Sequence, residues 1–360
     1  MDLLSLLRSG DASTGLASPL AASETILSPA VAIAEAMGLE ISRLPMNRAQ
    51  AIQIPAVARS RNLLVGYGAP LPLVALDGNG RVKRQPPFLY RSNNKEHENP
   101  YERCVWTIDD LFFHGVALWV VSRGAASSGS AYGPILDASR MPRERWRIVA
   151  GNKIEVFVND EHGWVEAPAE GVIVFNGPTS GLLQDANGTL RAAQAIERAY
   201  VDRAQNPVPL MVIRHQQGAT PQDQLTETEA TELLEKWRAA RNKPGGTAGG
   251  YLPPTLQLDI PGIDAQALLQ EARNAVRIDV ANHANIPVAM LDGGVSEESL
   301  TYRNAEGEVS RFYRDLKFWL DPIQHRLSDD DVVPRGQRVR FDLSEYDTPA
   351  PEPTGVPTED

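Results

Sequence analysis

The side chains of this sequence that could catalyse a reaction or bind a metal are scattered, and none forms a recognisable site. No two of the six histidines have the spacing that puts two metal ligands on one helix face. Three carboxylates, Asp329 to Asp331, follow a predicted helix end, where a solvated turn is the usual structure and a cation site the alternative. The one cysteine, Cys104, excludes an intrachain disulfide, and we interpret it as a small buried side chain. We therefore expect no catalytic residues, no metal site and no cofactor.

One glycine-rich stretch, from Lys243 to Gly250, could expose backbone N–H groups to an anion. A phosphate-binding loop needs Lys and then Ser or Thr at its end, after a strand and before a helix. Here the lysine precedes the glycines, and a predicted helix comes first. The stretch is therefore interpreted as a flexible surface loop.

The length, the net charge and the apolar runs of the sequence disfavour several classes of protein. A chain of 360 residues favours two or more substructures. The net charge of −11, from 35 basic and 46 acidic residues, disfavours a protein that grips nucleic acid through its phosphates. The longest apolar run, Leu111 to Val121, is interrupted by His114 and Gly115 and is too short to cross a bilayer, so no membrane segment is expected.

Two helix-patterned segments near the C-terminal end carry the strongest signal. Apolar or small residues recur at three- and four-residue spacing between Ala265 and His283, opposite a polar row that includes Arg273 and Arg277. A second helix follows, which Pro322 should kink. Its predicted apolar face consists of Val309, Phe312, Tyr313, Leu316, Trp319, Leu320, Ile323 and Leu327.

The remaining chain alternates between strand-rich and helical stretches. A helix from Ile54 to Val65 precedes a β-rich region from Leu73 to Asn176, and the helix of that region is expected from Trp106. Another helix runs from Leu190 to Ala204. A small α/β unit follows, in which two strands flank a helix from Thr226 to Asn242. The predicted class is α+β.

This order of helix, "NIPVAMLDGG" loop and "SLTYRNAEGEVSRFYRDLKFWLDPIQHRL" helix resembles the portal proteins of tailed double-stranded DNA bacteriophages, of the HK97-like kind. The resemblance implies a portal fold with a β-rich wing, long stem helices, a small α/β clip and a tunnel loop followed by a kinked helix. The implied division is an N-terminal arm (1–46), wing (47–189), first stem helix (190–207), clip (208–262), second stem helix (263–286), tunnel loop (287–300), kinked helix with a final strand in the wing or a short crown (301–346), and a disordered Pro-rich tail (347–360).

The resemblance also implies three groups of site residues. On the second stem helix, Arg273, Arg277 and His283 would face a DNA channel or a neighbouring subunit, with a solvated helix face as the alternative. The tunnel loop would be formed by Pro287, Val288, Met290, Asp292, Gly293, Gly294, Glu297, Glu298 and Ser299, whose acidic side chains would repel phosphate. Partners would dock on the clip at Trp237, Arg238, Arg241, Lys243, Gly245 and Gly246.

As a portal protein the chain would form a ring, of twelve copies as the family implies, through which double-stranded DNA is packaged and ejected. Its implied partners are the terminase large subunit, a head-tail connector or adaptor protein and the major capsid protein. Its implied location is the portal vertex of the virion, after assembly in the host bacterial cytoplasm. The alternatives are a cytosolic α+β enzyme, such as a hydrolase, and another phage head or neck ring protein.

Overall fold

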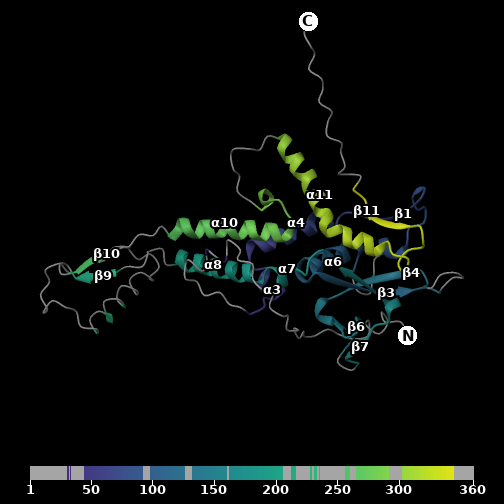
Figure 1. The fold of residues 1–360 in the computed structure, drawn as a ribbon, viewed down its shortest axis with the longest axis horizontal. Helices are drawn as coiled ribbons and strands as arrows, with labels where there is room; N and C mark the ends of the chain where they lie inside the picture. Colours follow the sequence, from purple (N-terminus) through teal and green to yellow (C-terminus); the bar gives the residue numbers. More distant parts are fainter. Residues whose placement is uncertain are drawn as a thin grey trace, which may run out of the picture. The chain divides into compact units, whose positions relative to one another are not determined.

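Figure 1 shows the computed structural model of the chain. It describes residues 31, 33, 44–91, 98–125, 132–159, 162–205, 212–215, 228, 231–232, 235, 256–259, 265–291 and 302–343. Its contacts divide the chain into two units, one of residues 1–195 with 272–360 and one of residues 196–271. Two long helices, α8 (Asn187–Gln205) and α10 (Ala265–Ala284), each run from one unit into the other.

The first unit contains most of the other described helices and three antiparallel sheets. Its helices and 3-10 turns are α3 (Arg48–Ala51), α4 (Pro55–Gly68), α5 (Pro87–Tyr90), α6 (Pro100–His114), η1 (Arg143–Arg145), η2 (Ala169–Gly171), α7 (Leu182–Asp185), η4 (Val288–Met290) and α11 (Tyr302–Leu327). Its strands are β1 (Leu73–Asp77), β2 (Gly80–Arg81), β3 (Val116–Arg123), β4 (Ile135–Met141), β5 (Trp146–Val149), β6 (Lys153–Phe157), β7 (Trp164–Glu166), β8 (Val172–Asn176) and β11 (Arg338–Phe341). This mixture confirms the predicted α+β class.

The centre of the first unit is the sheet β4-β3-β8, in which β3 is the middle strand. Strand β3 is buried on both faces, because helices α6 and α11 pack on one side of the sheet and a second sheet lies against the other. Trp119 faces the helices, where its Nε1 donates to Thr107 Oγ1 of α6 at 2.7 Å. A strand buried on both faces reads as a continuous apolar run, and "VALWVV" is such a run.

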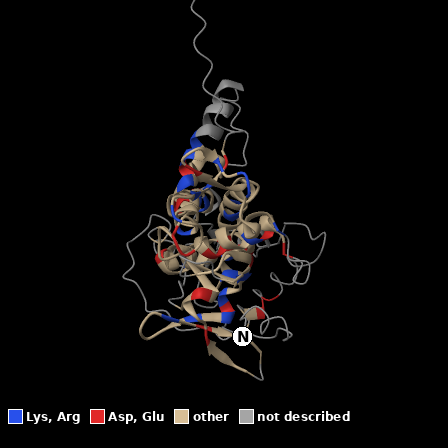
Figure 2. Cartoon of the chain, turned by 90° about the vertical axis from the view of Figure 1, so that its right-hand side faces the viewer, with Lys and Arg blue, Asp and Glu red and all other residues tan. Residues whose placement is uncertain are grey.

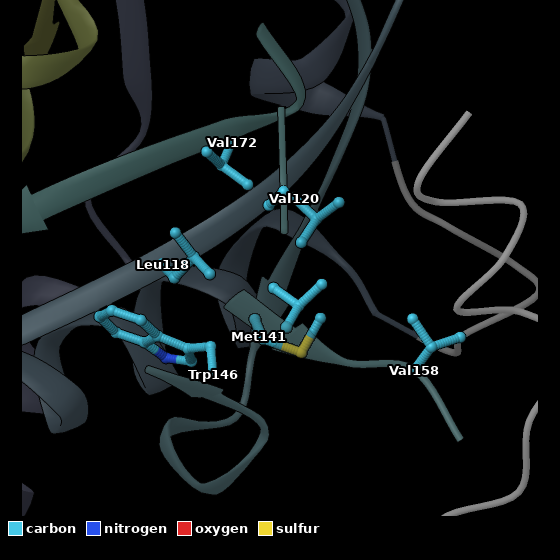
Figure 3. Close-up of a cluster of buried hydrophobic side chains, with 8 residues drawn as sticks. Leu118, Val120, Met141, Trp146, Val158 and Val172 are labelled. Carbon is cyan, nitrogen blue, oxygen red and sulfur yellow. The ribbon is translucent and has the colours of Figure 1, made fainter. Parts of the chain in front are cut away.

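The second sheet, β5-β6-β7, is joined to the first by one hydrophobic cluster, part of which Figure 3 shows. Leu118 and Val120 of β3 point into it, one residue out of phase with Trp119, as the period of a strand requires. Its members are Leu118, Val120, Met141, Trp146, Val156, Val158, Ala167 and Val172. Strand pairing alone would leave the second sheet unattached, so this cluster holds the β-rich region together.

The third sheet, β11-β1-β2, brings the C-terminal strand back to the start of the unit. Phe341 of β11 lies opposite Leu73 of β1 in an antiparallel register. Helix α11, which contacts β11, β8, α4 and α6, buries the predicted apolar face from Phe312 to Leu327. Pro322 lies inside this helix, which continues to Leu327, and the side chain of Val309 is outside the described residues.

Two local predictions for the β-rich region were wrong. The helix expected from Trp106 begins at Pro100, because Asn99 caps it and forms a capping box with Glu102. Strand β4 was missed altogether, although it supplies an edge of the central sheet. Its sequence "ILDASRM" lacks both strict alternation and a continuous apolar run, so its burial depends on its partner β3.

The second unit is described in part. It contains the antiparallel pair β9 (Val212–His215) and β10 (Leu256–Asp259), with Ile213 opposite Leu258. The described residues between these strands, 228, 231–232 and 235, are helical. All lie within the helix expected from Thr226 to Asn242.

Candidate functional site

Helix α10 carries the residues predicted to face a channel, and its surface divides into two sides. Leu269, Ala272, Val276 and Val280 are buried. Gln270, Asn274, Ile278 and Asn282 are exposed and follow one another at four-residue spacing, so they form one row along the helix. This row is uncharged and contains one large apolar side chain, Ile278, which is 45% exposed.

Arg273 and Arg277 lie one turn apart along one edge of that exposed row. Both are half-buried. The Arg277 guanidinium donates from Nη1 to Asn274 Oδ1 at 3.2 Å. The structure therefore places these two predicted residues together.

His283 lies on a different side of α10. It follows Arg277 by six residues, which at 3.6 residues per turn places it about 120° round the helix. Burial lowers the pKa of His283, while the nearby carboxylates of Asp279 and Asp185 oppose that shift. Its imidazole is therefore neutral at pH 7, and it does not extend the positive edge that Arg273 and Arg277 form.

The end of α10 is fixed by a C-terminal cap centred on Asn285. This residue adopts a positive φ of 53°. The Asn285 N–H donates to Asn282 O at 3.3 Å and the Ile286 N–H to Ala281 O at 3.0 Å, which is the hydrogen-bond pattern of the Schellman motif. Asn285 was not predicted as a cap, although Asn is, after Gly, the residue that adopts this conformation most readily.

The capped end is also attached to α11. Trp319 Nε1 donates to the free carbonyl of Ala284 at 2.7 Å, and Asn285 Nδ2 donates to Asp315 O at 3.2 Å. Trp319 is itself 1% exposed. The point where α10 ends is thus held by two side-chain hydrogen bonds that span more than 25 residues of sequence.

The first residues of the predicted tunnel loop are anchored to this framework. Pro287 is half-buried, and Val288 to Met290 form the turn η4. Arg59 Nε of α4 donates to Met290 O at 3.3 Å, and Leu291 is buried. The predicted loop residues Asp292, Gly293, Gly294, Glu297, Glu298 and Ser299 lie outside the described residues.

The predicted docking residues of the clip, Trp237, Arg238, Arg241, Lys243, Gly245 and Gly246, also lie outside the described part of the chain. Elsewhere, basic and acidic residues are interspersed along the described helices and strands, as the blue and red segments of Figure 2 show. A surface that grips phosphate tightly needs clustered cations.

A cluster of buried charges that was not predicted from the sequence lies at the surface of α6. Asp109 accepts hydrogen bonds from Arg48 and Arg61, and Asp110 forms a two-bond ion pair with Arg140 at 2.6 and 2.7 Å. All three guanidinium groups lie 5.2–5.8 Å from the ring centroid of Trp106. The carboxylates are held by arginines and not available to a substrate, so the cluster joins α3, α4, α6 and β4 structurally.

Several titratable groups of α6 have displaced pKa values. Burial raises the pKa of Asp110 to about 6, although its pairing with Arg140 opposes the shift. Burial lowers the pKa of His114 to about 4, and its Nε2 has no hydrogen-bond partner among the described residues. Burial also raises the pKa of Cys104 to about 11, so its thiol stays protonated at neutral pH, which argues against a nucleophile there.

The other predicted features have ordinary explanations. The three carboxylates after α11 are paired with arginines, since Arg326 contacts Asp329 and Asp331 and Arg335 contacts Asp330. Within the described ranges, no three His, Cys, Asp or Glu side chains are grouped closely enough to hold a metal ion. No described helix has both the length and the apolarity of a membrane span.

Neither a protein-family model nor a curated protein matches the sequence. Solved structures do match. An HK97 family phage portal protein from Corynebacterium diphtheriae is 28% identical, with a TM-score of 0.63 over 83% of this chain and 96% of that one.

Two structures of gene transfer agent particles share the fold at lower identity. A chain of the neck of an empty particle, computed with C6 symmetry, is 17% identical with a TM-score of 0.52, over 87% of this chain and 89% of that one. A chain of the native virion is 16% identical with a TM-score of 0.51, over 89% and 90%. With the sequence pattern, these matches identify the chain as a portal-type protein that has the fold of the HK97 family of phage portal proteins.

Proposed function

We propose that this chain forms the closed ring of a phage portal vertex, through which double-stranded DNA is packaged and ejected. The observation that carries the proposal is the match to the portal protein of Corynebacterium diphtheriae over nearly all of that protein's length. A gene transfer agent neck of the same fold, computed with C12 symmetry, supports a ring of twelve copies. A structural role in the virion, without catalysis, is part of this proposal.

Within such a ring, the exposed row of α10 and its arginine edge would face the channel or the next subunit. A channel lining with two half-buried arginines in each copy touches phosphate without gripping it, because Arg277 is already engaged by Asn274. The neutral His283 adds no further positive charge. Light contact of this kind suits a duplex that must slide.

The segment 292–299 would then act as the tunnel loop. Its two ends are held, by η4 and Leu291 on one side and by α11 on the other. Glu297 and Glu298 would repel the DNA backbone from inside the channel. The residues 208–262 would form the clip, on which the terminase large subunit and the head-tail connector dock, while the rest of the ring meets the major capsid protein in the host cytoplasm.

Ring formation is tested by native mass measurement of the purified chain. Twelve chains of 39.3 kDa would total about 470 kDa. A closed ring of a neighbouring copy number still supports cyclic assembly. A monomer or dimer at micromolar concentration, or particles without an axial hole in electron micrographs, contradicts the proposal.

The loop is tested by deleting residues 292–299, which spares η4 and the buried Leu291. We expect rings of normal mass that package DNA and then lose it. The matched control replaces Glu297 and Glu298 by Gln in a loop of full length, which separates charge from length. Normal DNA retention by the deletion variant would exclude the tunnel role while leaving the ring intact.

A further inference from the structure

A pocket of about 410 Å³ lies in the first unit. Its lining residues come from the segment between Ala69 and Cys104, so none of them belongs to α10. It is formed by the chain between α4 and β1, by Arg81 and Gln85, and by the ends of α5 and the start of α6. Three prolines line it, Pro70, Pro72 and Pro100. Two tyrosines at its edge, Tyr90 and Tyr101, are 61% and 50% exposed.

These side chains have the chemistry of a site for an extended, proline-rich segment. Such segments adopt a polyproline II helix with little loss of conformational entropy and dock on grooves lined by aromatic rings. Tyrosine supplies an apolar ring together with a hydroxyl that can donate to a carbonyl. Buried Leu71, Leu89 and Cys104 complete an apolar floor.

The pocket is also positive. Arg103 lines it and is 2% exposed. Its two terminal nitrogens donate to the carbonyls of Phe88 and Ala138, and its Nε has no partner among the described residues. Arg81 lines the edge of the pocket, and Lys83 and Arg84 are exposed just beyond it. Among the described residues, none that lines the pocket is acidic.

The chain itself delivers a segment of complementary chemistry to this place. Strand β11 ends with Phe341 opposite Leu73, and the Asp342 N–H donates to Pro72 O at 2.9 Å. Leu73 and Pro72 both line the pocket, so the backbone at Phe341 and Asp342 lies beside it.

The residues that follow, 344–360, contain four prolines, five acidic residues and no lysine or arginine. Seven residues in polyproline II geometry span about 20 Å, which is ample to reach across the pocket.

We propose that this pocket is the docking site for residues 344–360 of the same chain. The prolines of that segment pack on Tyr90 and Tyr101, and its carboxylates lie towards Arg81, Lys83 and Arg84. Intrachain docking is favoured because the segment starts at the pocket rim, which raises its effective concentration above that of any free competitor.

The test places a photo-crosslinking amino acid, p-benzoylphenylalanine, at position 101 of the full-length chain. Chains with light and heavy nitrogen are mixed before assembly, irradiated and digested for mass spectrometry. We expect cross-links from position 101 to residues 344–360 that carry the same isotope. The matched control places the probe at position 164, where Trp164 is 38% exposed on β7, and we expect no such product.

A charge swap provides a second measurement. Arg81→Glu should lower the cross-link yield several-fold, and Glu352→Lys in the same chain should restore it, while Lys153→Glu on β6 should leave it unchanged. Products that join different isotopes, products with residues 1–43, or no product from a probe at either 101 or 90 would overturn the intrachain proposal. So would a yield that does not respond to Arg81→Glu in a variant of unchanged thermal stability.

Discussion

At the scale of single residues, the buried carboxylate of Asp109 carries a charge that must be paired for the first unit to be stable. Its side chain is 0% exposed, and its two oxygens accept three hydrogen bonds of 2.7–2.8 Å from Arg48 and Arg61. Burying a carboxylate is unfavourable unless it is fully paired, and here the pairing is complete. The same arginines lie over Trp106, so one residue organises the contact of three helices.

Replacing Asp109 by Asn should therefore lower the free energy of unfolding by about 3–5 kcal/mol, because it leaves two arginines without their charge partner. Chemical denaturation at pH 7 measures the change. The control is Glu166→Gln, which breaks the exposed Lys153–Glu166 pair, whose side chains are 56% and 57% exposed. That change should cost less than about 1 kcal/mol. Equal effects of the two variants would contradict the role given to burial.

His114 makes the stability of the chain depend on pH. Its folded pKa of about 4 lies below the ordinary histidine value of about 6.5, so the unfolded chain binds the extra proton. Stability from this group is complete above pH 6.5 and is lost as the pH falls towards 4, by up to about 3 kcal/mol. The charged groups around it are Arg143, Glu144, Asp109 and Arg140.

The variant His114→Phe should lack this loss, which urea unfolding at pH 7 and pH 4.5 measures. Asp110 acts in the opposite direction, because its raised pKa gives stability that is lost as the pH rises from 3.8 to about 6. The difference between wild type and His114→Phe at each pH removes this shared contribution. A difference that does not change between the two pH values would show that His114 does not titrate as described.

At the scale of elements, the junction between α10 and α11 depends on the backbone of Asn285. A positive φ is disfavoured for residues with a Cβ, and most of all for β-branched ones. Asn285→Val should cost about 1–2 kcal/mol from the backbone and somewhat more from the lost bond to Asp315 O. Asn285→Gly keeps the conformation and should cost less than about 1 kcal/mol. Thermal unfolding of both variants tests the motif, and an equally large loss with Gly would place the effect in the side chain alone.

The elements show what the sequence could and could not predict. The apolar faces of α10 and α11 followed from periodicity, because their buried residues recur at three- and four-residue spacing. The start of α6 did not, since the prediction weighed apolar spacing and overlooked the local cap of Asn99 and Glu102. Strand β4 could not be found from its own residues, because its burial is decided by β3.

For the candidate site, too, local features could be predicted from the sequence and long-range contacts could not. Arg273 and Arg277 were placed together by their four-residue spacing, which is a local property of a helix. The Asp109 cluster was missed because Arg48, Arg61 and Arg140 come from distant parts of the chain, and only the tertiary fold brings them to one tryptophan. Long-range charge pairing leaves no periodic signal in a single sequence.

At the scale of the whole molecule, a ring requires each copy to offer two unlike faces to its neighbours. A face that becomes buried between subunits is expected to carry apolar side chains that are exposed in the single chain. Ile278 on α10 and Phe318 on α11 are exposed apolar residues of this kind, at 45% and 38% exposure. Single exposed apolar residues are common on proteins, so exposure alone does not assign them to an interface. Ile278 stands in the uncharged row of α10, where a neighbouring subunit could pack without burying a charge.

Ile278→Asp should therefore shift the assembly from the proposed ring, about 470 kDa for twelve copies, towards single chains, while the chain itself stays folded. An aspartate buried between subunits without a partner makes the free energy of assembly less favourable. On the exposed helix surface of a single chain, the same aspartate hardly changes the free energy of unfolding. The matched control is Ile148→Asp on β5, because Ile148 has the same 45% exposure and lies outside the row. Native mass measurement reports the assembly, and circular dichroism reports the fold. Intact rings of Ile278→Asp would assign the exposed row of α10 to the channel, and loss of the ring with Ile148→Asp would instead place the interface on the second sheet.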